Sequence, residues 1–177
     1  GALLKRIEEL ALQLEKPATI MEVCGTHTHS IAAAGLRRLM PKNVRLVSGP
    51  GCPVCVTPIG WVDRAMALAA REDVIVTTFG DMMRVPASHG TLEESRASGA
   101  DVRICYSTRD ALNIEREHPD KKVVFLAVGF ETTAPTIAGA LEEAENEGVD
   151  NFMILAGHKT MPEPLEILMD NEKVQQD

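Results

Sequence analysis

The sequence predicts an α/β fold in which a parallel β-sheet lies between layers of helices. Short apolar runs of four to six residues recur along the 177-residue chain, and a segment with helical spacing follows each of them. Strands that are buried on both faces show this near-continuous apolar pattern. Strand and helix alternation favours parallel pairing with right-handed crossovers. The composition, with 45% hydrophobic and 25% charged residues, is that of a globular chain.

The first expected element is a helix over residues 3–15, because apolar residues recur every three or four positions up to Leu14 and Pro17 then stops the pattern. Pro135 and Pro162 follow the last two apolar runs and suit the first turn of a helix, where a missing N–H costs nothing. The expected strands are 19–23, 44–47, 74–77, 102–105, 123–128 and 152–155.

The chain is expected to hold one α/β domain with helices on both faces of its sheet and the first half of a second, similar domain. A charged run over 109–122 suggests the boundary. The first domain, 3–118, would carry the motifs CGTHTH and GPGCPVC, and the partial second domain, 119–177, would carry GFETTAP and GHKTMP. The alternative is that the last two strands extend the first sheet.

Charge and composition exclude several classes of function. The net charge is −8, no Lys/Arg cluster is present and aromatic residues make up 3% of the chain, so nucleic-acid binding is not expected. No apolar run approaches the ~20 residues that cross a bilayer, so no membrane association is expected. Four cysteines are too few for a disulfide-stapled secreted fold of this length, and we expect a cytoplasmic protein.

The segment SGPGCPVCVTP, residues 48–58, is the most informative. Cys52 and Cys55 are separated by two residues, a spacing that suits either a small disulfide ring or joint binding of one metal ion. The surrounding Gly and Pro residues favour a rigid, exposed loop. A structural zinc site needs four ligands, so two more would have to come from elsewhere.

The motif CGTHTH, residues 24–29, follows the first expected strand and could supply those ligands. Cys24 and His27 have a spacing seen in metal sites, and a thiolate near an imidazole suits a soft or borderline metal. The alternative is that His27 and His29 only cap the next helix. If the first two strands are adjacent, Cys24 lies near Cys52 and Cys55.

Polar residues also follow the fifth and sixth strands. Glu131 could donate a proton or orient another group, whereas Thr132 and Thr133 could equally be helix caps. His158 and Lys159 stand at the matching position after the sixth strand, where an anion could bind. Cys105 ends an apolar strand and is expected to be a small buried residue.

In this order, CGTHTH, GPGCPVCVTP, GFETTAPT and GHKTMP closely resemble the HypD family of nickel-iron hydrogenase maturation factors. The resemblance runs from Ile20 onward. It implies a scaffold, rather than a conventional turnover enzyme, that binds iron together with a small HypC-type chaperone while the Fe(CN)2CO centre is assembled. Cyanide would come from a HypE-type partner.

The resemblance also implies roles for individual residues. Cys24 would be the iron-holding thiolate with His27 beside it, and Cys52 and Cys55 would form a redox-active dithiol. The polar lining on the other side of a cleft would consist of Glu131, Thr132, Thr133 and His158.

The chain departs from the family pattern at its end. Family members are about twice as long and carry a carboxyl-terminal cysteine set for a 4Fe-4S cluster, whereas no cysteine follows Cys105 here. We therefore expect an amino-terminal fragment. Two other functions stay open: a thiol–disulfide oxidoreductase using Cys52 and Cys55, and a zinc-binding module built from these cysteines with Cys24 and His27.

Overall fold

The computed structural model describes residues 1–49 and 51–171, and their contacts divide the chain into two units. Unit 1 consists of Gly1–Cys52 with the chain from Met169, and unit 2 consists of Pro53–Leu168. Both hold parallel strands with intervening helices, which confirms the layered α/β class. None of the helices in the described ranges is long and apolar enough to cross a membrane.

Unit 1 is built around two parallel strands. They pair in register from Ala18 opposite Val44 to Glu22 opposite Ser48. The first helix is shorter than expected and is tied to the strands by Asn43, whose Nδ2 donates to the carbonyl oxygen of Ala11 at 2.7 Å. In chain order the unit contains α1 (Ala2–Ala11), β1 (Ala18–Glu22), α2 (Gly25–Ala33), α3 (Leu36–Leu39) and β2 (Val44–Ser48).

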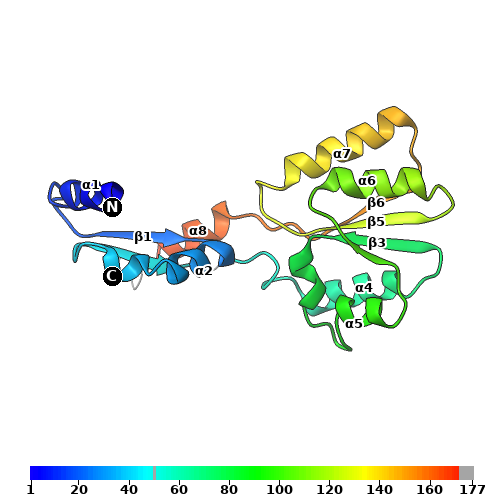
Figure 1. The fold of residues 1–177 in the computed structure, drawn as a ribbon, viewed down its shortest axis with the longest axis horizontal. Coiled ribbons are helices and arrows are strands. Elements are labelled where there is room, and N and C mark those ends of the chain that lie inside the picture. Colours follow the sequence, from blue (N-terminus) through cyan, green and yellow to red (C-terminus); the bar gives the residue numbers. More distant parts are fainter. Residues whose placement is uncertain (50, 172–177) are drawn as a thin grey trace. The chain divides into compact units, whose positions relative to one another are not determined.

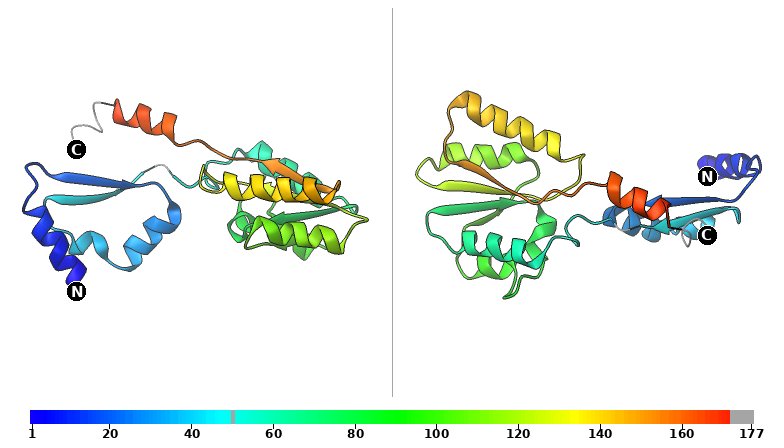
Figure 2. Two further views of the ribbon diagram at one scale, coloured as in Figure 1. Left: turned by 90° about the horizontal axis from the view of Figure 1, so that it is seen from above. Right: turned by 180° about the vertical axis from the view of Figure 1, so that it is seen from behind.

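Unit 2 holds a four-stranded parallel sheet with the order β4-β3-β5-β6. In Figures 1 and 2, α6 and α7 cover one face of this sheet and α4 and α5 the other. Its elements are α4 (Ile59–Ala69), β3 (Val74–Thr78), the 3-10 helix η1 (Gly80–Arg84), α5 (Leu92–Ala97), β4 (Val102–Ile104), α6 (Thr108–Glu117), β5 (Lys122–Ala127), α7 (Ala134–Glu147) and β6 (Phe152–Ala156), and α8 (Pro162–Met169) follows.

The last two strands extend the sheet of unit 2. β5 pairs directly with β3, from Val74 opposite Lys122 to Thr77 opposite Phe125, and β6 pairs with β5. The chain therefore passes the boundary expected at 118/119 without leaving the sheet. Contacts divide it instead between Cys52 and Pro53.

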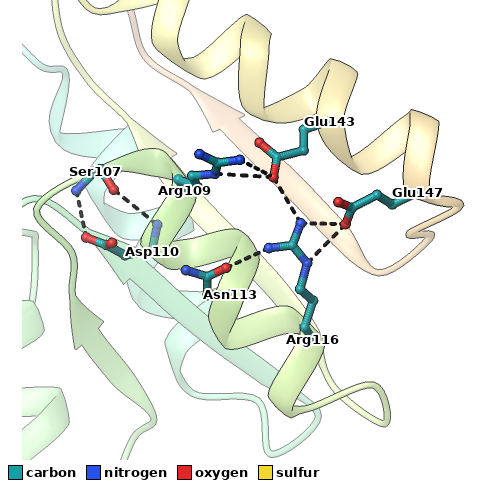
Figure 3. Close-up of polar contacts among 7 residues, drawn as sticks. All are labelled: Ser107, Arg109, Asp110, Asn113, Arg116, Glu143 and Glu147. Atoms are coloured by element: carbon teal, nitrogen blue, oxygen red, sulfur yellow. Dashed lines mark hydrogen bonds and ion pairs between the residues drawn. The ribbon is translucent and has the colours of Figure 1, made fainter.

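The charged run that suggested that boundary lies largely on α6 and joins this helix to α7. Arg116 contacts both Glu143, at 3.0 Å, and Glu147, while Arg109 also contacts Glu143 at 3.1 Å (Figure 3). Hydrogen bonds from Arg116 and then from Arg109 hold the pKa of the Glu143 carboxyl below its usual value. The charges thus connect two helices of one layer rather than two domains.

The core of unit 2 is centred on β3 and β5, whose apolar side chains are almost completely buried. Phe125 is 0% exposed and packs edge-to-face on Phe79, with ring centroids 5.2 Å apart. We predict that Phe125→Ala lowers the free energy of unfolding by about 3 to 5 kcal/mol, the usual cost of such a cavity. Denaturant unfolding followed by circular dichroism measures this.

The matched control for this prediction is Tyr106→Ala. Tyr106 is 93% exposed, so removal of its ring should change the free energy of unfolding by only about 0.5 kcal/mol. Equal destabilisation by both substitutions would contradict a core centred on Phe125.

Candidate functional site

The first part of the candidate site lies at the carboxyl ends of β1 and β2. Because these strands are parallel and Glu22 pairs with Ser48, the turns that follow them begin at the same edge of the sheet. The backbone N–H of Gly49 donates to the carbonyl oxygen of Glu22 at 2.8 Å, which ties the second turn to the first.

Two glycines allow these turns to approach each other closely. A methyl group on Gly51 would overlap the carbonyl group of Val23 and lie 2.6 Å from its Cα. A methyl group on Gly25 would lie 3.7 Å from Cβ and 3.9 Å from Sγ of Cys52. The thiol of Cys52 therefore lies near Gly25, the residue that follows Cys24.

Glu22 organises the first turn and was not identified from the sequence. Its carboxylate accepts the backbone N–H of Cys24 at 3.0 Å and the hydroxyl of Thr28. The hydrogen bond from the Thr28 hydroxyl and, to a smaller extent, the one from the Cys24 N–H hold the pKa of the Glu22 carboxyl below its usual value. The carboxylate therefore stays ionised. The sequence feature that could have pointed to Glu22 is its place at the end of an apolar strand, two positions before a cysteine.

Cys24 immediately precedes α2 and is half-buried. His27 and His29 lie within α2 and are exposed, and the amino-terminal end of this helix has no side-chain cap. The histidines therefore do not act as caps. His27 stays a candidate ligand that would be carried on the first turn of the helix begun by Cys24.

Cys55 belongs to unit 2 and is exposed. Throughout residues 1–49 and 51–171, no group of three or more His, Cys, Asp or Glu side chains is placed to hold a metal ion. Cys55 contributes to a groove of about 550 Å³ that is mainly apolar and is lined by Val54, Cys55, Thr57, Ile59, Asp81, Arg84, Val85 and Pro86.

The second part of the candidate site lies at the carboxyl ends of β5 and β6 in unit 2. These strands are neighbours, and their following turns are joined by two hydrogen bonds. The N–H of Lys159 donates to the carbonyl oxygen of Gly129 at 2.9 Å, and the N–H of Met161 donates to Oε1 of Glu131 at 2.8 Å. The motifs GFETTAP and GHKTMP therefore form one surface.

Glu131 is an acceptor on this surface. The pKa of the Glu131 carboxyl is held below its usual value by the hydrogen bond from the Met161 N–H and, to a smaller extent, by the backbone N–H of Glu131 itself. This favours an orienting role over proton donation near neutral pH. Thr132 is exposed, and the hydroxyl of Thr133, although it precedes α7, donates to the carbonyl oxygen of Phe130 at 2.9 Å rather than capping the helix.

His158 is half-buried, and its Nε2 is buried without a hydrogen-bond partner among the described residues. The neighbouring Gly157 lies against Trp61, because a methyl group there would come 2.8 Å from Cε2 of the indole. Trp61 also donates from Nε1 to the carbonyl oxygen of Ala156 at 2.8 Å. Trp61 thus supports the turn from which His158 projects, a contact between distant segments that the sequence does not reveal.

The comparisons with known proteins agree with these motifs. The profile of the HypD family, described as the hydrogenase formation hypA family, matches residues 1–177. This chain belongs to the HypD family. Proteins named hydrogenase maturation factor HypD are 48% identical to it in Rhizobium leguminosarum bv. viciae, over 98% of this chain, and 48% identical in Escherichia coli K12, over 94% of it. The relative from Cupriavidus necator is 50% identical over 87% of the chain.

The chain spans less than half the length of these HypD relatives. The matches cover 46% of the Rhizobium protein, 44% of the Escherichia protein and 41% of the Cupriavidus protein.

The candidate residues of this HypD chain form two local groups. One lies around Cys24 and Cys52 in unit 1, and the other lies around Glu131 and His158 in unit 2.

Cys105 is the one cysteine of this HypD chain outside the two motifs. It is 2% exposed at the end of β4, and burial raises the pKa of its thiol to about 11. Its predicted burial is confirmed. A thiol that stays protonated at neutral pH is a poor metal ligand and nucleophile, so Cys105 serves packing.

Proposed function

We propose that this chain takes part in the maturation of nickel-iron hydrogenases by holding an iron ion while cyanide and carbonyl ligands are attached to it. The observation that carries the proposal is the close packing of the turn containing Gly51 and Cys52 on the turn containing Cys24 and Gly25. This packing supports a site in which the thiol groups that follow β1 and β2 serve one iron ion, either as a ligand or as an electron donor.

In this proposal Cys24 is the iron-holding thiolate, because iron that carries cyanide and carbonyl needs a soft donor. His27 is its helper from the first turn of α2. Glu22 fixes the backbone of Cys24 by accepting its N–H and leaves the thiol available for the metal.

Cys52 and Cys55 are proposed as the redox pair. Conversion of two thiols into a disulfide breaks two S–H bonds, forms one S–S bond and makes two electrons and two protons available, so the pair could serve as a two-electron donor. Proline at position 53 restricts the loop that carries the pair, and glycine at position 51 allows the loop to approach the backbone of Val23.

Glu131, Thr132, Thr133 and His158 are proposed to contribute a polar surface that orients ligands of the iron. The ionised carboxylate of Glu131 and the buried Nε2 of His158 support this role, since both can hold a hydrogen-bonding group in a fixed position.

The proposed partners are a small HypC-type chaperone and a HypE-type cyanide donor, in the cytoplasm, where thiols stay reduced. The chain would be an assembly factor rather than a conventional turnover enzyme. The 4Fe-4S cluster expected for the family has no ligand set among the four cysteines of this chain, since three belong to the motifs above and Cys105 is buried.

Metal analysis tests the iron proposal. The chain is purified under anaerobic conditions together with the small chaperone, and iron and zinc are measured by mass spectrometry. We expect about one iron per complex. A stoichiometric zinc ion with no iron would instead favour the zinc-binding module.

For the redox pair, we predict that the number of titratable thiols in aerobically purified protein rises by two per chain after treatment with a reductant. The reason is that Cys52 and Cys55 oxidise together, whereas the buried Cys105 does not react. Titration with a chromogenic disulfide under denaturing conditions measures the difference. Cys55→Ala should abolish this rise, and a wild-type chain with no rise would refute the redox role.

The groove beside Cys55 favours one second candidate, a thiol–disulfide oxidoreductase acting directly on proteins. An exposed thiol in a mainly apolar groove of about 550 Å³ could accommodate an extended peptide. Reduction of insulin separates the two functions, because the assembly scaffold should leave insulin disulfides intact.

A further inference from the structure

The indole of Trp61 requires glycine at the position before His158. Trp61 lies in the first turn of α4 and is 8% exposed. A methyl group on Gly157 would come 2.8 Å from Cε2 and 2.9 Å from Cζ2 of the ring. Gly157 does not have a positive φ, so the ring rather than the backbone angle excludes a side chain here. With its 2.8 Å bond to the carbonyl oxygen of Ala156, Trp61 contacts both residues that precede His158.

The same turn is also bonded to the end of β5 and to the turn that follows it. The N–H of Gly157 donates to the carbonyl oxygen of Ala127 at 2.8 Å, and the N–H of Lys159 donates to that of Gly129 at 2.9 Å. These bonds continue the pairing of β6 with β5. Trp61 approaches from α4 instead, so the turn is held from two different elements.

The imidazole of His158 depends on this support. Its Nε2 is buried and has no hydrogen-bond partner among the described residues. A polar atom buried in this way carries a free-energy cost, which a side chain on a loose turn would avoid by moving into water. Fixing the backbone on both sides of the residue restricts that movement. The nitrogen is thereby kept at one position for a group that binds to it.

The helix that carries Trp61 begins at the turn of Cys55. The hydroxyl of Thr57 closes this turn by donating to the carbonyl oxygen of Pro53 at 2.8 Å. Pro58 is the N-cap of α4, and its carbonyl oxygen accepts the N–H of Trp61 at 2.9 Å. All of these residues belong to unit 2. The first turn of α4 therefore connects the turn of Cys55 to the turn that precedes β6's histidine.

We propose that Trp61 is a positioning residue that holds the imidazole of His158 at a fixed place relative to the turn of Cys55. It acts through the backbone of residues 156 and 157 rather than by touching a bound group. The use of this positioning in iron assembly rests on the proposed function, whereas the positioning itself belongs to unit 2 and can be measured without iron.

Nuclear magnetic resonance of the 15N-labelled chain tests the proposal through the amide exchange of Gly157 and Lys159 and the ring signals of His158. In Trp61→Ala both amides should exchange at least about 10-fold faster than in wild type, because the turn loses its contacts with α4. The ring signals of His158 should shift. Trp61→Phe keeps an aromatic ring and removes only the N–H donor, so its effect should be smaller. Amides of β3 and β5 should stay protected and show that unit 2 is folded.

Gly157→Ala tests the same contact with the indole still present. Its methyl group should displace the turn and shift the ring signals of His158, whereas Gly139→Ala, on α7, should not, because a methyl group there meets no atom within 4 Å. Added to Trp61→Ala, Gly157→Ala should change the exchange rates by no more than about 2-fold, because both substitutions disrupt one contact.

The proposal would be overturned by wild-type exchange rates and ring signals in both Trp61→Ala and Gly157→Ala. Additive effects in the double variant would also overturn it, and so would equal acceleration of exchange in β3 and β5 in every variant, which would indicate general loss of stability. Failure of the proposed function is a separate result, seen as a chaperone complex that contains no iron.

Discussion

Replacement of Cys24 by alanine should reduce the iron content of the chaperone-bound chain from about one ion to background. Cys24 is half-buried at the start of α2, and its backbone is held by Glu22 through a 3.0 Å hydrogen bond. Alanine keeps this backbone contact and removes only the thiol, so the loss would report on the metal ligand itself. Iron is measured by mass spectrometry on complexes purified under anaerobic conditions.

Cys105→Ala is the matched control, because it removes a thiol that is 2% exposed and whose pKa is raised to about 11. It should keep the wild-type iron content, although it leaves a small cavity in unit 2. Full iron occupancy in the Cys24→Ala complex would rule out Cys24 as the essential ligand, and loss of iron in both variants would point to general destabilisation.

The second large effect is expected from Gly51→Ala. The new methyl group would overlap the carbonyl of Val23, a backbone group that no side-chain rotation can move away. The turn carrying Cys52 must therefore shift away from the turn carrying Cys24. We expect a loss of iron affinity of about 10- to 100-fold, the range typical of changes to groups that position the residues at a metal site.

Gly60→Ala provides the control for this substitution. Gly60 lies in the first turn of α4, and a methyl group there meets no atom within 4 Å. Alanine should leave iron affinity unchanged and favour the helix by about 0.5 to 1 kcal/mol. An iron titration of the three proteins measures the affinities, and wild-type affinity in Gly51→Ala would show that close packing of the two turns is not required.

The structure separates what local patterns reveal about the site from what they do not. All six strands found in residues 1–49 and 51–171 occur where apolar runs are flanked by turn residues, and burial of Cys105 follows from its place at the end of such a run. Glu22 was missed because its role depends on the direction of one side chain. Trp61 was missed because it contacts Gly157, which lies 96 positions further along the chain.

The expected division of the chain illustrates the same difference. A charged run resembles a linker when its partners are unknown, yet Arg109 and Arg116 contact acidic residues of α7, more than 25 positions away. The strand order β4-β3-β5-β6 likewise depends on pairings between distant segments, which apolar runs do not specify by themselves.

The sequence by itself determined the α/β class, the order of strands and helices, the cysteine and histidine motifs, and the HypD family. These properties are local, because hydrophobic spacing and turn residues act within a few positions. Only the tertiary structure decided that Gly51 brings Cys52 against the turn of Cys24 and that the last strands join the sheet of β3. These properties depend on which distant surfaces meet, and burial is decided by the whole set of contacts rather than by the composition of any one segment.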